Sequence, residues 1–418
     1  MRVRFVIITS LFWAGYALLM LSIPRSANAA EWSALPSVRV GQEYNDNLQL
    51  TIQPHNSVIG SMVAPKLDLA VTSDIWQLSG GAEAVQKRFS GDSALNRDDR
   101  FYNLGASYST ERSTWQLTGS STKSSVLADE IVSPDTGLVE IQKVQDIHSI
   151  NPTWTWSMNE RTQLQIAYSL SNVSYVDGQS VGLNDYSTRA ISAQLSNNFD
   201  LHDQIFVSAG YAIFNVPSTT FESKSNLYQA GITRTFSETM KGTLSAGRRN
   251  SSSEQTVLTC SVPNPFFPIF GPPCLQTAQI TASSRATSSV FSGILDKTYE
   301  TTRLKITLSR IFDPSGLGGE VRTDSQEVRL SRQFTPKLSA NFFLGNYEYK
   351  SETGNLPGID RHYYTYGPGL HWMWTEELSV DMNYLYRHIK RADEDKPTSS
   401  NSAYLTLKYQ WPKMSFSR

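Results

Sequence analysis

Cysteine, charge and long apolar runs are all scarce in this sequence. Only two cysteines occur in 418 residues, which excludes a disulfide scaffold and a multi-cysteine metal centre. Charged residues make up 18% of the chain and the formal net charge is −1, so no basic excess points to nucleic acid as a partner. Aromatic residues reach 11%, too many for a disordered chain. The length of such a folded chain ordinarily suggests two or three soluble domains.

The N-terminus has the layout of a secretory signal peptide. A short basic start precedes an apolar run over residues 5–23, which Pro24 ends, and a small-x-small pattern closes at Ala29. We expect residues 1–29 to be a signal peptide; an uncleaved membrane anchor is the alternative. No later stretch is long and apolar enough for a membrane helix. The mature chain is therefore either soluble outside the cytoplasm or a membrane barrel.

Period-two alternation is the strongest pattern in the rest of the chain. Between residues 303 and 309, Leu304, Ile306 and Leu308 share one face and polar side chains share the other. The same alternation recurs over residues 163–171, 205–213 and 378–386. It predicts amphipathic β-strands, which fit either a soluble sandwich or a membrane barrel.

The spacing of turns and loops favours the barrel. Several predicted strands end in an aromatic residue followed by a tight polar turn, most clearly at Trp156, Phe199, Phe236, Phe334 and Trp374. Longer loops alternate with these turns, at residues 91–99, 128–143, 177–184, 255–279, 313–320, 351–360 and 392–400. Short turns at one edge, long loops at the other and aromatics beside the short turns are typical of outer-membrane barrels. Such a sheet must close, because lipid satisfies no unpaired backbone amide.

Counting predicted hairpins gives about 18 strands, with about 16 as the alternative. The first strand is placed at Val38–Thr51 and the last at Ser402–Trp411. The count of 16 depends on the irregular stretch Val58–Val71, where Pro65 removes a ladder bond and predicts a local bulge. We predict an all-β fold in which residues 30–418 form a closed antiparallel transmembrane β-barrel in contact with bacterial outer-membrane lipid. A soluble all-β protein of two or three sandwich domains is the alternative.

The predicted last strand carries a further membrane signal. Tyr409 and Trp411 form an aromatic-x-aromatic end, which resembles the signal read by the barrel assembly machinery. The family glycine is absent and residues 412–418 follow the last aromatic, so the match is incomplete.

Chemistry-bearing clusters are few. The six histidines are scattered, and none has a partner at metal-ligand spacing on one strand. His148, Ser149 and Asn151 form the only cluster that suggests an outer-membrane hydrolase at the barrel rim. No catalytic residue, metal or cofactor is predicted, and the protein is expected not to be an enzyme.

The two cysteines lie in one predicted external loop. In an oxidising compartment Cys260 and Cys274 are expected to form a disulfide, worth roughly 3 kcal/mol in the chain-entropy model. The bond is expected to stiffen the loop. The alternative is a lid or docking surface, because the loop carries the apolar residues Phe266, Phe267, Ile269 and Phe270.

Charged residues on the predicted inner faces bear on transport. Assigning faces from the aromatic anchors puts seven charged residues in the C-terminal half of the lumen: Arg303, Lys305, Arg329, Arg387, Lys408, Glu327 and Asp381. The basic excess predicts a lumen that focuses anions or acidic glycans. A mixed-charge lumen without selectivity is the alternative.

The stretch Val38–Leu50 resembles the opening strand of a family of bacterial outer-membrane barrels, in which a glycine precedes a Tyr-x-Asp-Asn-Leu core. Tyr44, Asp46 and Asn47 match that core. The family comprises porin-like barrels often associated with exosortase (PEP-CTERM) systems and exopolysaccharide production. The resemblance implies polysaccharide or export-system proteins as partners, and it brings no catalytic residues.

Three functions remain open at this point. The first is a porin-like channel for hydrophilic solutes or a secreted exopolysaccharide. The second is a non-conducting structural or docking barrel of an envelope polysaccharide or protein-sorting system. The third is a hydrolase at the rim.

Overall fold

The computed structural model describes residues 30–52, 56–126, 143–263, 274–352 and 360–417, and the side chains of residues 257–278, 280, 416 and 417 are not described. The predicted signal peptide therefore lies outside the described residues. Within these ranges no helix has the length and apolarity needed to cross a bilayer.

The described strands form one antiparallel sheet of 19 strands. They are β1 (Glu31–Asn45), β2 (Val58–Thr72), β3 (Trp76–Ser90), β4 (Arg97–Ser109), β5 (Ser113–Ser125), β6 (Val144–Ser157), β7 (Thr162–Tyr175), β8 (Tyr186–Asn198), β9 (Asp203–Val216), β10 (Phe221–Ser237), β11 (Met240–Pro263), β12 (Cys274–Thr298), β13 (Thr302–Ser315), β14 (Gly319–Thr335), β15 (Leu338–Ser351), β16 (Arg361–Met373), β17 (Leu378–Arg391), β18 (Thr398–Gln410) and β19 (Met414–Ser417).

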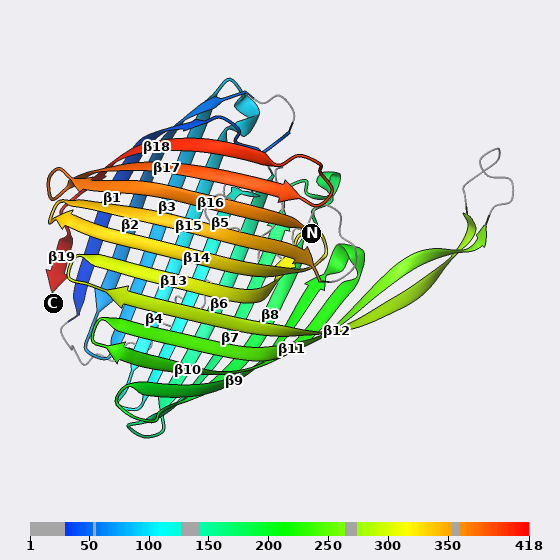
Figure 1. Ribbon diagram of the computed structural model, residues 1–418, viewed down its shortest axis with the longest axis horizontal. Helices are drawn as coiled ribbons and strands as arrows, with labels where there is room; N and C mark the ends of the chain where they lie inside the picture. Colours follow the sequence, from blue (N-terminus) through cyan, green and yellow to red (C-terminus); the bar gives the residue numbers. More distant parts are fainter. Residues whose placement is uncertain (1–29, 53–55, 127–142, 264–273, 353–359, 418) are drawn as a thin grey trace.

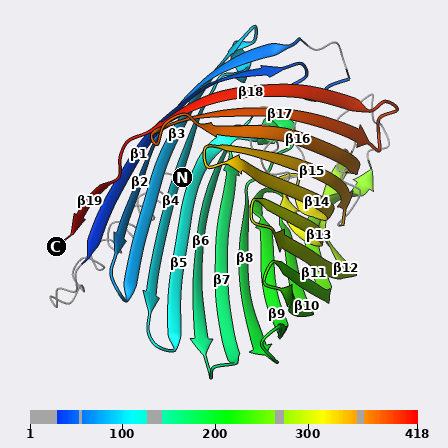
Figure 2. The ribbon, with the colours of Figure 1, turned by 60° about the vertical axis from the view of Figure 1, so that its left-hand side comes forward.

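The sheet closes on itself. Each strand pairs with the next, and β1 pairs with both β2 and β18, so that Val38 lies opposite Pro65 on one side and Tyr409 on the other. The short β19 continues past β18 and pairs with the beginning of β1. Figures 1 and 2 show the strands wrapping into a barrel around an interior. The predicted closed barrel of 18 strands is confirmed, and the sandwich alternative is wrong.

The two ends of the barrel differ as predicted. At one end, the turn end, all connections are short: residues 73–75, 110–112, 158–161, 199–202, 238–239, 299–301, 336–337 and 374–377. Exposed aromatics stand beside these turns, including Phe199, Phe334 and Trp374. The longer connections lie at the opposite end, the loop end. In outer-membrane barrels these ends face the periplasm and the exterior respectively.

Two predicted loops are too long, because the 313–320 connection shortens to residues 316–318 and much of 255–279 is strand. Residues 255–279 are not a loop throughout, because β11 and β12 continue pairing beyond the barrel wall as a two-stranded ribbon, visible at the right of Figure 1. The ladder between β12 and β13 ends at Phe291 and Arg310, and the ladder between β10 and β11 ends at Phe221 and Gln255, so the ribbon has no further strand beside it beyond these points. The alternation-poor sequence of this segment hid the strands.

Pro65 does less than predicted. The pairing of β2 with β3 skips Ala64 and Pro65, as a missing N–H requires, but it resumes in the same register at Lys66 opposite Glu83. No bulge forms. The same two-residue gap accompanies Pro152 and Pro368.

The outer face is apolar across the middle of the barrel. On β9, Ile205, Val207 and Tyr211 are 48%, 55% and 38% exposed, although their side chains are large and apolar. Such exposure is stable only against lipid. The alternate residues of each strand face the interior, and hydroxyl and amide side chains predominate there.

Candidate functional site: the lumen and its mouth

The inner faces of six adjacent strands, β5 to β10, carry no charged side chain. We call this surface the neutral arc. One cross-strand row illustrates it: Thr114, Thr155, Gln165, Gln194, Ser208 and Gln229 are successive partners across the six strands. Hydroxyls and amides both donate and accept hydrogen bonds, so this arc can exchange partners with water or a hydroxylated solute.

The other strands, β11 to β18 and β1 to β4, carry the inward charges, and we call their inner surface the charged arc. Most of its cations are paired with carboxylates. The pairs are Arg39–Glu83, Lys87–Glu43, Lys66–Asp68, Arg97–Asp99, Arg249–Glu320, Arg303–Asp296 and Arg329–Glu327. This pairing leaves a weaker field for anions than a count of basic residues suggests.

The strand registers put the seven predicted lumen residues on the inner face: Arg303, Lys305, Arg329, Arg387, Lys408, Glu327 and Asp381. Asp381 Oδ1 lies 2.7 Å from His371 Nδ1. Lys305 lies opposite Asp296 in the ladder, and Lys408 lies opposite Arg39. Their effect on solutes stays a prediction.

Arg387 has a different surrounding from the other six. Arg387 is 2% exposed, and its guanidinium donates to the carbonyl oxygen of Leu48 at 3.2 Å and to Ser400 Oγ at 3.2 Å. Two positions on, Arg391 donates to the carbonyl oxygen of Leu50 at 3.3 Å. These two arginines hold the loop after β1 inside the mouth of the barrel. Sequence reasoning assigned Arg387 to open lumen because the loop that covers it is distant in the chain.

The motif that follows Tyr44 turns this loop inward. Asp46 accepts hydrogen bonds from the backbone N–H of Asn401 at 2.7 Å and from its Nδ2 at 2.6 Å. Asn45 Nδ2 donates to Ser402 Oγ at 2.8 Å, and Asn47 Oδ1 accepts from the N–H of Thr51 at 3.1 Å. The polar residues of the motif thus replace the ladder bonds that the chain gives up when β1 ends at Asn45. The predicted strand Val38–Thr51 is therefore too long at its C-terminal end.

Leu50 from this loop fills part of the mouth. It is 7% exposed and packs in a cluster with Val321, Tyr347, Tyr349, Tyr363 and Ile389. Leu48 packs separately with Val58, Phe89 and Leu95. Both leucines bury apolar surface in a position that the loop's polar anchors determine.

A second segment, the tip of the β13–β14 hairpin, crosses the mouth from the other side. The carbonyl oxygen of Gly316 accepts from the N–H of Asn184 at 2.7 Å. Leu317 packs against the Val126–Leu183 cluster and also against the cluster that contains Leu50. The mouth at the loop end is therefore narrowed by two segments that meet at Leu317.

The predicted hydrolase cluster is divided between two faces. Alternation places His148 on the outer face, 3.3 Å from Asp146, and Ser149 on the inner face. Ser149 Oγ is 2.7 Å from Ser120 Oγ, and Asn151 accepts from Ser169 at 2.7 Å. The three side chains do not converge, and no group of metal-ligating residues occurs among the described residues.

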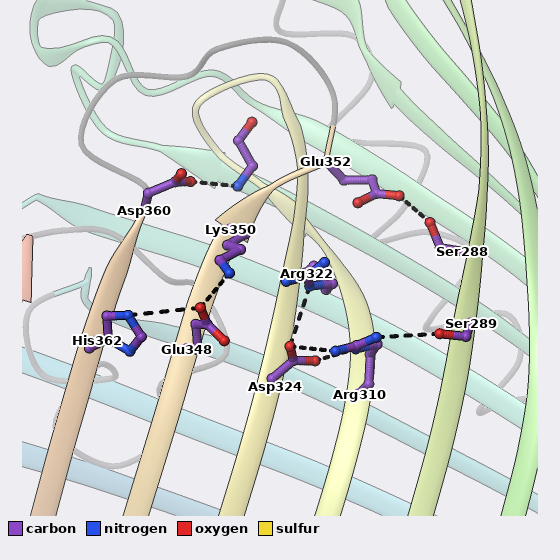
Figure 3. Close-up of polar contacts among 11 residues, drawn as sticks. Ser288, Ser289, Arg310, Arg322, Asp324, Glu348, Lys350, Glu352, Asp360 and His362 are labelled. Atoms are coloured by element: carbon purple, nitrogen blue, oxygen red, sulfur yellow. Dashed lines mark hydrogen bonds and ion pairs between the residues drawn. The ribbon is translucent and has the colours of Figure 1, made fainter. Parts of the chain in front are cut away.

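A charged network lies on the outer face of β13 to β16 toward the loop end, shown in Figure 3. Asp324 binds Arg310 at 2.9 Å and lies 3.4 Å from Arg322, while Glu348 bonds to Lys350 and lies 3.8 Å from His362. Asp324 lies between two arginines, and Glu348 lies between Lys350 and His362. These ion pairs lie where the outer face leaves the apolar belt.

The two cysteines are not cross-strand partners. Cys260 lies opposite Thr277, and Cys274 lies opposite Pro263. The side chains of both cysteines, and residues 264–273 with Phe266, Phe267, Ile269 and Phe270, lie outside the described part of the chain. The disulfide and the lid or docking surface stay predictions.

No protein-family model matches the chain, and no curated protein matches it in sequence. Among solved structures, OccAB4 of Acinetobacter baumannii is 10% identical with a TM-score of 0.48 and coverage of 94% of this chain and 100% of that one. The ferric-catecholate import receptor Fiu of E. coli K12 is 10% identical, with a TM-score of 0.46 and coverage of 93% and 82%. The outer membrane protein OpdK of Pseudomonas aeruginosa is 10% identical, with a TM-score of 0.43 and coverage of 92% and 99%.

The class of the protein follows from its own geometry. The described strands close into an antiparallel barrel whose outer belt is apolar, whose inner face is polar and whose connections are short at one end only. These features define a transmembrane β-barrel of the bacterial outer membrane.

Proposed function

We propose that the protein is a gated, porin-like channel for hydrophilic, hydroxyl-rich solutes. The observation that carries the proposal is the neutral arc, six adjacent strands whose inner faces present hydroxyls and amides without charge. A passage lined in this way replaces the hydrogen bonds of a polyol or sugar as it sheds water, and it holds no ion strongly.

A secreted polysaccharide is the solute we favour. The resemblance of the Tyr44–Leu50 segment to barrels of exosortase and exopolysaccharide systems supports it, as does the pairing of most lumen cations with carboxylates. Paired cations bind anions weakly, so we propose weak charge selectivity in place of strong anion preference.

The loop after β1 is the proposed gate. Arg387 and Arg391 hold it through two carbonyl oxygens, and Leu50 meets the apolar cluster of the mouth. Movement of this loop, together with the hairpin tip at Leu317, widens the passage.

Planar-bilayer recording tests the channel and its gate together. We expect small, intermittent conductance for the wild-type protein and a severalfold larger conductance for Arg387→Ala combined with Arg391→Ala. Lys390→Ala is the matched control, because Lys390 lies between them on the outer face of β17. If neither wild type nor the double variant conducts, the channel proposal is wrong.

The narrowed mouth also favours a second candidate, a non-conducting barrel that docks polysaccharide or export-system proteins. The β11–β12 ribbon beyond the wall offers such a partner an accessible element. Electrical silence in the double variant, together with stable co-purification of an envelope protein, would support this candidate.

We propose that the barrel has no catalytic activity of its own. Screening purified protein against lipid and peptide ester substrates tests this. Hydrolysis that disappears in His148→Ala would overturn it.

A further inference from the structure

We propose that the lumen contains a binding subsite for one neutral sugar unit, formed around Asn341 and Asn383. The proposal rests on the proposed channel function, because a sugar reaches this position only through the lumen. It goes further by naming the residues that bind the sugar and the class of sugar that they accept.

The subsite is a cavity of about 340 Å³. It is lined by residues from both sides of the barrel seam, among them Lys87, Arg97, Asn341, Phe343, Asn383 and Tyr404. Phe89, two residues after Lys87 on β3, packs with Leu48 of the inward loop. The cavity therefore lies next to the gate on its turn-end side, where a solute from the periplasmic end meets the narrowed mouth. Its volume is at the small end of ligand pockets, which suits a single sugar ring.

Two amides of the cavity lining, those of Asn341 and Asn383, converge over Gly369, which follows the lining residue Pro368. Gly369 lies between Asn341 and Asn383 in the ladder. A Cβ atom on Gly369 would lie 2.4 Å from Oδ1 of Asn383 and 2.5 Å from Oδ1 of Asn341. A side chain at this position would have to displace both amide groups. Neither amide has a hydrogen-bond partner within the described ranges.

Each free amide offers a donor pair and an acceptor, which matches adjacent hydroxyls on a sugar ring. Both asparagines are exposed to the lumen, so their amides can exchange water for the hydroxyls of a ligand. Two such amides side by side favour a hydroxylated ligand.

Aromatic side chains and a buried phenol complete the surroundings. Phe343 and Tyr404 supply apolar surface for the C–H face of a sugar ring. Tyr404 Oη is buried and has no hydrogen-bond partner among the described residues. This is a second, independent polar group that lacks a partner at the same cavity, and its unmet hydrogen bond costs free energy that a ligand hydroxyl would restore.

The charges at the cavity favour a neutral sugar over an acidic one. Lys87 is paired with Glu43, and Arg97 lies 3.1 Å from Asp99. An acidic sugar would have to displace one of these carboxylates, whereas a neutral hydroxyl accepts from the cation without breaking the pair.

The test measures oligosaccharide binding to the purified full mature barrel in detergent by isothermal titration calorimetry. Maltotriose is the neutral probe and trigalacturonic acid is the acidic probe. We expect maltotriose to bind wild type, and we expect Asn383→Leu and Gly369→Leu each to weaken that binding about tenfold, since each removes one or two hydrogen bonds.

Gly81→Leu is the matched control. A Cβ on Gly81 would also lie close to an inward amide, 2.7 Å from Asn103 Oδ1, but Asn103 does not line this cavity, whereas Asn341 and Asn383 do. We expect this variant to bind maltotriose within about twofold of wild type. Heat-modifiable migration on gels establishes that each variant is a folded barrel, and Asn383→Leu keeps the test open if Gly369→Leu does not fold.

The outcomes separate this proposal from the channel. Equal loss of binding in Gly81→Leu, or tighter binding of trigalacturonic acid than of maltotriose, overturns the subsite. Conductance without maltotriose binding overturns the subsite and leaves the channel standing. Maltotriose binding without conductance in any variant overturns the channel and leaves the subsite standing.

Discussion

The two arcs of the inner wall share one backbone geometry and differ in what their side chains bind. In the neutral arc, hydroxyls and amides contact near neighbours, as Asn151 and Ser169 do, and otherwise face the lumen. At the loop end of the charged arc, some side chains reach elements far away in sequence, as Arg249 does to Glu320 of the hairpin that crosses the mouth. These charges hold inserted segments, most of the other inward pairs join the same or neighbouring strands, and the uncharged wall is what remains available to a solute.

The largest expected effect comes from breaking a buried pair in the charged arc. Arg249→Ala leaves Glu320 buried without its cation, and we expect the free energy of unfolding to fall by about 3–5 kcal/mol. Urea denaturation in detergent micelles measures it. Arg248→Ala, one residue away on the exposed outer face, serves as control and should change stability little. Equal effects of the two variants would mean that the pair does not hold the hairpin.

The next effect compares the cost of introducing a charge on the lipid face of the neutral arc with the cost on its lumen face. Val207→Arg places a charge in the lipid belt, and we expect about 2–4 kcal/mol of destabilisation near mid-membrane. Ser208→Arg, the next residue, points into the lumen and should cost much less. Folding titrations into lipid vesicles compare them. If the order is reversed, the assignment of the two faces is wrong.

A smaller effect separates the arcs by ion selectivity. Gln194→Lys introduces an unpaired cation in the neutral arc, and we expect reversal potentials to move toward anions by up to about fivefold in permeability ratio. Lys305→Gln removes a cation that lies opposite Asp296, and it should move selectivity toward cations by less. A larger shift from Lys305→Gln would show that the charged arc governs permeation.

The smallest effect lies at the turn end, outside the strands. The backbone N–H groups of His202 and Asp203 donate to Asp200 and hold the pKa of its carboxyl below the usual value. Because the pKa of this carboxyl is lower in the folded state, the ionised group stabilises the turn at pH values above the unfolded pKa of about 3.9. This stabilisation is lost as the pH falls through the lower pKa of the folded state. Unfolding of Asp200→Ala should therefore differ from wild type at pH 7 and converge with it in acid. A difference that does not vary with pH would contradict this origin.

The strands and short turns could be read from sequence because their signals are local. Alternation such as Ile205, Val207 and Tyr211 fixes a face, and an aromatic before a polar turn, as at Phe199, marks an end. Lipid then forces closure, so the barrel followed from short-range patterns and one physical constraint.

The structure of the mouth could not be predicted from the sequence in the same way. The Asn45–Asn47 motif directly follows an alternating strand, and its true partners, such as Asn401, come together with it only when the barrel closes. Likewise, alternation places Arg387 on the inner face, but the loop that buries it follows the first strand and is distant in the chain. Nothing local distinguishes Gly369 from other strand glycines, because its meaning depends on two amides from neighbouring strands.

The pairing of β1 with β18 also determines when the barrel can close during synthesis and assembly. Asn45 and Ser402, which hydrogen-bond across it, are 357 residues apart in the chain. Until the last strand has been synthesised and delivered, β1 keeps an unpaired edge that can template aggregation. A chain truncated before β18 would therefore lack its last strand and also leave its first one open. The barrel assembly machinery, as the predicted partner, would have to hold β1 for the whole of that interval.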